Sequence, residues 1–154
     1  MRLYHFTAPA ARSHLGSILR EGWIRTTESN VSLEREHAGP DVVWLTTDGA
    51  PEAHAGWAVG LPGPIDGAKT WARLTVDVND AVPWKDFATQ HAMKRRDREA
   101  LTAFGDGDSW WVALRPIPRK EWAELQIALP DHYPLIFKGN RLRALTMPPS
   151  AYSF

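Results

Sequence analysis

Alternating apolar and polar positions recur along the chain and predict short β-strands. The clearest case is residues 70–78, where the even-numbered positions from Ala72 to Val78 are apolar and the odd-numbered positions are mostly polar. Successive side chains of a strand point to opposite faces, so this segment predicts a strand with one face against a core. Further strands are expected at residues 3–7, 42–47, 109–115, 121–129, 133–138 and 142–146.

Two segments have the apolar spacing of amphipathic helices. Residues 8–22 predict a helix because Thr7 is a suitable N-cap, Pro9 fits the first turn and Gly22 fits the C-terminal end. Residues 84–104 predict a second helical region. Its candidate core positions are Trp84, Phe87, Ala88, Ala92, Leu101 and Phe104.

The expected strands outnumber the helices and are grouped along the chain. This arrangement favours an α+β domain with mainly antiparallel sheets over a parallel sheet with alternating helices. At 154 residues the chain fits a single domain spanning residues 1–154, large enough to bury one good core.

Composition narrows the classes of function. The 18 basic and 18 acidic side chains balance, so any contact with a polyanion must be local. There is no cysteine, which excludes disulfides, thiolate nucleophiles and cysteine-based zinc sites. The six histidines show no metal-ligand spacing, so no metal site is expected. No apolar stretch has the length of a membrane span, and a cytoplasmic protein without membrane contact is the expectation.

A carboxylate lies in the middle of the strand expected at residues 121–129. Alternation places Trp122, Glu124 and Gln126 on one face, so the acid would lie between an indole and an amide. An ordinary edge strand with one exposed Glu is the alternative. The residues expected to face the core are Ala123, Leu125 and Ile127.

Three segments, taken in order, resemble motifs of the ADP-ribosyltransferase superfamily. Residues 3–22 resemble its first strand, which bears a His and a short polar residue, and the helix that follows and ends in Gly. Residues 42–47 resemble its second core motif, and residues 123–131 resemble its catalytic-Glu strand. The resemblance implies a split pair of mainly antiparallel β-sheets with flanking helices around a cofactor cleft. It also implies NAD as cofactor and transfer of ADP-ribose to a macromolecular acceptor, with release of nicotinamide.

The resemblance assigns a catalytic role to Glu124, which would stabilise the cation-like ribose and take a proton from the incoming nucleophile. The superfamily's NAD contacts correspond to His5, Thr7, Arg35, Trp44 and Thr46.

Each of these positions also has an ordinary structural interpretation. His5 is equally compatible with a core histidine that has its hydrogen bonds satisfied, and Trp44 with packing alone. Arg35 lies in the polar segment 28–41, which is either a cofactor-covering loop or a solvated connection.

The local sequence also bears on the acceptor. Superfamily members that modify arginine often carry Glu or Gln two positions before the catalytic Glu, whereas Trp122 stands here. The form around Glu124 is more similar to the branch that modifies nucleobases in DNA, which favours DNA or RNA as acceptor. Such an enzyme would serve as a toxin, a phage-borne modifier or a housekeeping protein.

Three alternatives stay open at the sequence level. If Gln126 takes the catalytic position, the chain would bind NAD and barely react. A module that binds NAD, ADP-ribose or a nucleic-acid end without catalysis is the second alternative. An RNA 2'-phosphotransferase is the third, although it would require a His or a basic group where Trp44 or Thr46 stands. The basic run at residues 94–98 is either a solvated helix face or a phosphate contact.

Overall fold

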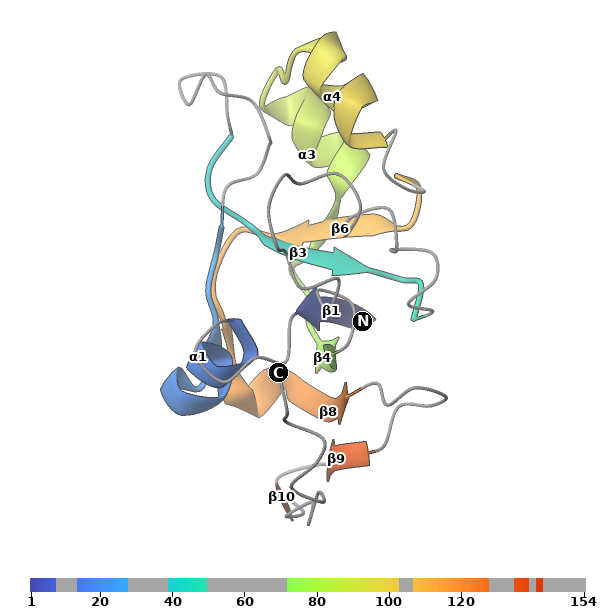
Figure 1. Ribbon diagram of the computed structural model, residues 1–154. Helices are drawn as coiled ribbons and strands as arrows, with labels where there is room; N and C mark the ends of the chain where they lie inside the picture. Colours follow the sequence, from blue (N-terminus) through green and yellow to red (C-terminus); the bar gives the residue numbers. More distant parts are fainter. Residues whose placement is uncertain are drawn as a thin grey trace, which may run out of the picture.

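A computed structural model describes residues 1–7, 14–27, 39–49, 72–102, 107–127, 135–138 and 141–142. Its larger sheet has eight strands, and every pair of neighbours is antiparallel (Figure 1). The order across this sheet is β10 (Arg141–Leu142), β9 (Leu135–Lys138), β8 (Trp122–Ile127), β4 (Ala72–Asp77), β1 (Arg2–Thr7), β3 (Val43–Thr46), β6 (Trp110–Ala113) and β5 (Val82–Pro83). The coarse expectation of an α+β protein with a mainly antiparallel sheet is confirmed.

A second, two-stranded sheet pairs β2 (Trp23–Ile24) with β7 (Ile117–Pro118). The helices in the described ranges are α1 (His14–Glu21), α3 (Trp84–Gln90) and α4 (Arg95–Thr102), together with a 3-10 turn η4 (Arg119–Glu121). None of the described helices is long and apolar enough to cross a membrane.

One face of the large sheet is covered by α1 and the two-stranded sheet. Leu15 and Ile18 of α1 share a buried cluster with Leu3 of β1 and Leu74 of β4. Gly22 ends α1 with a φ of 75°, and its amide donates to the Ile18 carbonyl oxygen at 2.8 Å. A left-handed conformation there favours glycine, as the sequence predicted.

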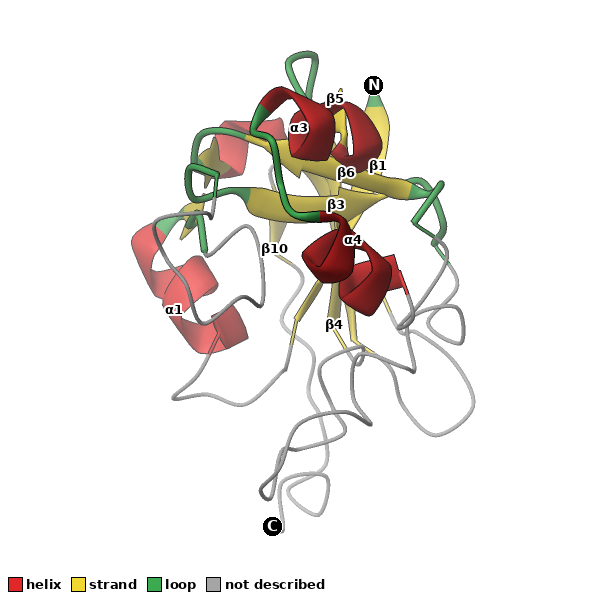
Figure 2. Cartoon of the chain, turned by 90° about the horizontal axis from the view of Figure 1, so that it is seen from above, coloured by secondary structure: helices red, strands yellow, loops and turns green. Residues whose placement is uncertain are grey.

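The opposite face of the sheet is covered at its other end by α3 and α4, apart from α1 (Figure 2). Trp84, Phe87 and Leu101 of the two helices pack with Trp110 and Val112 of β6. The core formed by the described residues is therefore divided into two clusters, one on each face of one sheet.

The expectation of one helical region over residues 84–104 is only partly correct. The structure has two helices, separated by a turn in which Ala92 takes a φ of 49°. The left-handed turn exposes Ala92, so its predicted core position is wrong, and Met93 is buried instead. Core positions are confirmed for Trp84, Phe87, Ala88 and Leu101, and Phe104 lies outside the described residues.

The expected face of Trp122 is also wrong. Thr75 of β4 pairs with Glu124, but the next residue, Val76, pairs with Trp122, so Ala123 is the extra residue of a β-bulge. A bulge shifts the alternation of side chains by one position. Trp122 therefore joins Leu125 in the buried cluster, and its side chain is not on the face of Glu124.

An ion-pair network connects the segment after β4 to the segment before β8. The Arg115 guanidinium donates to both Asp80 carboxylate oxygens, at 2.6 and 2.8 Å, and to both Glu121 oxygens, at 3.1 and 2.9 Å. The hydrogen bond from Arg115 holds the pKa of Asp80 below its ordinary value of 3.8.

We expect Asp80→Asn to lower the free energy of unfolding by about 0.5–1 kcal/mol at pH 7, since the pair is largely exposed to solvent. Because the folded-state pKa of Asp80 is lowered, its contribution is complete above the unfolded pKa and is lost as pH falls through the folded value. Urea unfolding at pH 7 and at pH 3 tests this, with the exposed Asp41→Asn as control. An Asp80→Asn effect of equal size at both values would contradict the assignment.

Candidate functional site

Glu124 lies in a row of side chains that crosses four adjacent strands on one face of the sheet. Thr46 pairs with Tyr4, Tyr4 with Thr75, and Thr75 with Glu124. Residues directly opposite each other on neighbouring strands point to the same face. The α1 cluster is on the other face of the sheet, so this row lies apart from it. Thr46 and Thr75 are buried, Tyr4 and Glu124 are half-buried, and Glu124 pairs in turn with Lys138 of β9.

The Glu124 carboxylate is held by Gln126, two residues along the same strand. The Gln126 Nε2 donates to Glu124 Oε1 at 2.9 Å, and the Gln126 Oε1 accepts from Arg73 Nη2. Arg73 also donates to the Gly49 carbonyl oxygen, and its guanidinium lies 5.0 Å from the centre of the Tyr4 ring. The contact with Tyr4 has the distance of a cation–π interaction.

The chemistry of arginine fixes the orientation of the Gln126 amide. A guanidinium only donates hydrogen bonds, so the oxygen of the amide must face Arg73 and its nitrogen must face Glu124. Among the described residues, Glu124 Oε2 has no hydrogen-bond donor. The Gln126 contact thus orients the carboxylate of Glu124, a half-buried residue, and leaves its second oxygen without a donor among the described residues.

His5 and Thr7 are on the opposite face from Glu124. They pair with Leu74 and Ala72, whose side chains belong to the cluster under α1. Thr7 is 5% exposed, and His5 is half-buried, with its Nδ1 at 2.9 Å from the Trp44 carbonyl oxygen. The structure therefore does not bring His5 and Thr7 together with Glu124.

The contact between His5 and Trp44 lies where two neighbouring strands, β1 and β3, share the fewest paired residues. Strands β1 and β3 are joined by one registered pair, Tyr4 and Thr46, whereas β1 and β4 are paired over six residues. The His5 ring reaches the backbone of β3 and adds a hydrogen bond between the two strands. This places His5 in a structural role at the junction.

Trp44 and Thr46 share the face of Glu124, but both make structural contacts. The Trp44 ring lies 6.3 Å from that of Trp84 and 6.0 Å from that of Trp110, at the edge of the α3–α4 cluster. The Thr46 hydroxyl donates to Ser109 Oγ at 3.2 Å and accepts from the Asp48 amide at 3.0 Å. Arg35 lies outside the described residues.

Sequence reasoning missed Tyr4 and Arg73 as members of this surface. Strand alternation could have predicted the face of both residues. Arg73 shares the polar side of β4 with Thr75, and Tyr4 lies on the face of β1 opposite to Leu3 and His5. Which polar side chains meet across strands depends on the pairing of β1, β4 and β8. That pairing is a tertiary property.

Comparisons with protein-family models, with curated proteins and with solved structures found no match to this chain. The resemblance to ADP-ribosyltransferases accordingly rests on the sequence motifs. In the part of the chain that the structure describes, no group of three or more His, Asp or Glu side chains could hold a metal ion.

We expect Arg73→Lys to lower the free energy of unfolding by about 1–2 kcal/mol, because an ammonium group does not reproduce the planar fork that bonds Gly49 and Gln126. Arg2→Lys is a matched control on a neighbouring strand, since the Arg2 side chain is 63% exposed and pairs with Asp77. Urea unfolding measures both. Equal and small effects would show that the contacts of Arg73 add no stability.

Proposed function

We propose that this protein transfers ADP-ribose from NAD to a macromolecular acceptor, with DNA or RNA favoured over protein arginine, and that Glu124 is the catalytic residue. The observation that carries the proposal is the oriented Glu124 carboxylate, with one oxygen bonded by Gln126 and the other without a donor among the described residues. The three sequence motifs in superfamily order add support.

The chemistry requires negative charge near the sugar. When the bond between nicotinamide and ribose breaks, its electron pair leaves with nicotinamide, and positive charge develops on the ribose. A fixed carboxylate stabilises that charge more than the ground state, which lowers the barrier. Glu124 then accepts the proton from the acceptor's nucleophilic oxygen or nitrogen as the new bond to the ribose forms.

The residues of the Glu124 face fit the dinucleotide only in part. Tyr4 and Arg73 supply an aromatic ring and a cation beside the carboxylate, and in this proposal they take over polar contacts of NAD. His5 and Thr7, which the resemblance assigns to NAD, are on the other face. A split of the sheet at the single β1–β3 pair, with a cofactor cleft there, is the finer form of the fold that this proposal requires.

A binding module without catalysis is the second candidate, and the position of His5 favours it. An enzyme of this superfamily needs its His and Glu to act on one bound dinucleotide, whereas here the sheet separates them. In a module, the Arg73–Gln126–Glu124 chain would be a structural network, and removing the carboxylate would leave binding unchanged.

We expect purified wild-type protein to release nicotinamide from NAD, with stimulation by the acceptor among DNA, RNA and a cell lysate. Glu124→Gln should lower the rate by about 10²–10³-fold, because a neutral amide does not stabilise the ribosyl cation. Glu21→Gln is the control, since Glu21 ends α1, at the opposite face of the sheet, and pairs with Arg25.

Two results would contradict the proposal that this protein is an enzyme. Equal rates for wild type and Glu124→Gln would remove Glu124 from the chemistry. If the wild type releases no nicotinamide under any condition, calorimetry with NAD separates the candidates. Binding with equal affinity for wild type and Glu124→Gln would favour the module, and no binding would refute both the enzyme and a module that binds NAD.

A further inference from the structure

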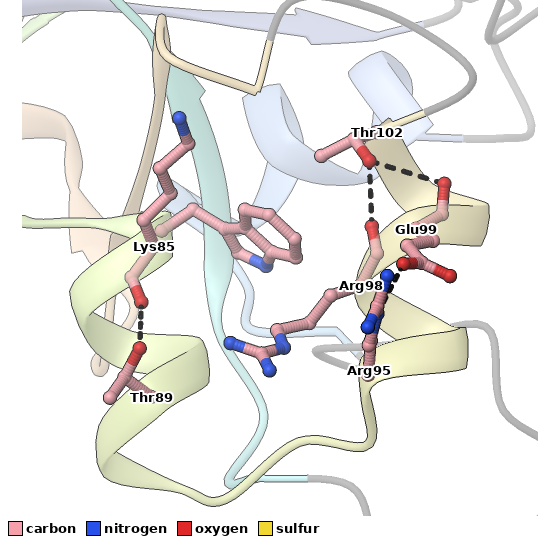
Figure 3. A pocket seen from close by; sticks show the side chains of 7 residues that line it. Lys85, Thr89, Arg95, Arg98, Glu99 and Thr102 are labelled. Carbon is pink, nitrogen blue, oxygen red and sulfur yellow. Dashed lines mark hydrogen bonds and ion pairs between the residues drawn. The ribbon is translucent and has the colours of Figure 1, made fainter.

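A pocket of about 440 Å³ lies between α3 and α4 (Figure 3), and Glu124 is not among its lining residues. Figure 3 shows the Arg98 side chain extending from α4 towards α3, into the space between the two helices. The lining side chains come from these two helices alone and are Trp84, Lys85, Thr89, Arg95, Arg98, Glu99 and Thr102.

The pocket is positively charged in a chain whose total charge is zero. Its lining includes Lys85, Arg95 and Arg98 but a single carboxylate, Glu99. Arg95 Nε donates to Glu99 Oε1 at 2.6 Å, and Lys85 donates to Asp108 outside the pocket. Among the described residues, the Arg98 guanidinium has no acceptor, so its charge is available to a ligand.

Two buried donors of the lining also have no partner in the described part of the chain. They are Nε1 of Trp84, a residue that is 1% exposed, and Nε of Arg98. A buried donor without an acceptor destabilises the folded protein, so native proteins rarely keep one without a reason. A bound group with several acceptor oxygens would satisfy donors of this kind.

We propose that this pocket binds a phosphate group of a nucleic-acid strand. A phosphate has several strong acceptor oxygens and matches the planar fork of arginine. The cations of the lining are also spread over both helices, because Lys85 is on α3 and Arg95 and Arg98 are on α4. A local row of cations suits a polymer with a charge on every unit better than a small anion.

The position of the pocket in the fold also suits a nucleic-acid acceptor. Trp84 packs edge-on against Trp110 at 5.6 Å and lies 6.3 Å from Trp44. Trp44 and Trp110 point to the same face of the sheet as Glu124. The pocket therefore lies on the same side of the sheet as Glu124. The binding itself does not depend on turnover of NAD.

Fluorescence anisotropy with a labelled single-stranded DNA oligonucleotide tests the proposal. Arg98→Gln should weaken binding at least tenfold and reduce the slope of log K against log salt by about 0.7, the value for one lost phosphate contact. Arg96→Gln is the matched control, because it removes the same charge from an exposed position on the same helix and does not line the pocket. Its loss should stay within about threefold.

A second variant tests the pocket without changing its charge. Trp84→Phe keeps an aromatic ring in the core and removes the indole N–H together with part of the indole ring, so binding should weaken severalfold while the urea unfolding curve stays cooperative. Arg98→Lys, which keeps the charge and loses the fork, should recover part of the affinity lost in Arg98→Gln. The anisotropy titration contains no NAD, so that a failure of the proposed enzyme and a failure of this pocket give different results.

Three outcomes would overturn the proposal. The first is no binding of the oligonucleotide by the wild type. The second is equal loss in Arg98→Gln and Arg96→Gln, which would reduce the effect to the general charge of α4. The third is calorimetry in which Arg98→Gln loses affinity for NAD and keeps its affinity for the oligonucleotide, which would assign the pocket to the dinucleotide.

Discussion

The pairing of β4 with β8 is the constraint on which the arrangement of side chains depends. Thr75 opposite Glu124 fixes the carboxylate on the polar face, and the extra residue Ala123 turns the next side chain, Trp122, into the core. Without the bulge, a buried indole would have to share the surface of the carboxylate. Because the side-chain period of a strand is two residues, a shift of one residue decides which groups can meet a ligand.

The same sheet separates the candidate chemistry into two parts. Leu3, Leu74 and Leu125 belong to the cluster under α1, and His5 and Thr7 share their face. Glu124, Gln126 and Arg73 are on the other face, where the α3–α4 cluster begins at Trp44. The segments that resemble superfamily motifs therefore do not bring His5 and Glu124 to one face of the sheet.

Much of the fold could be predicted from the sequence, because local patterns determine it. Alternation identified β4 with its buried and polar sides, and Gly22 marked the end of α1 through its positive φ. The errors arose where tertiary pairing overrides local pattern. Neither the bulge at Ala123 nor the left-handed turn at Ala92 leaves a recognisable mark in the sequence, since alanine favours neither conformation.

The candidate site could be predicted only in its central residue. Glu124 was identified from its place in an alternating strand, and Gln126 was placed on the same face because it lies two residues further along that strand. The hydrogen bonds that orient them come from Arg73, which is 53 residues away from Gln126 in the sequence. The basic run at residues 94–98 contains Arg98, but it does not show that the Nε of Arg98 lacks a partner. That property depends on how α3 and α4 pack.

Thiol labelling of single-cysteine variants tests the assignment of faces most directly, because the natural chain has no cysteine. Cysteine would be placed in turn at Trp122, Glu124 and Gln126, and its rate of reaction with a maleimide measured under native conditions. The account predicts that Glu124→Cys and Gln126→Cys react readily while Trp122→Cys is protected. Equal reaction at all three positions, as simple alternation requires, would contradict the bulge and the surface built on it.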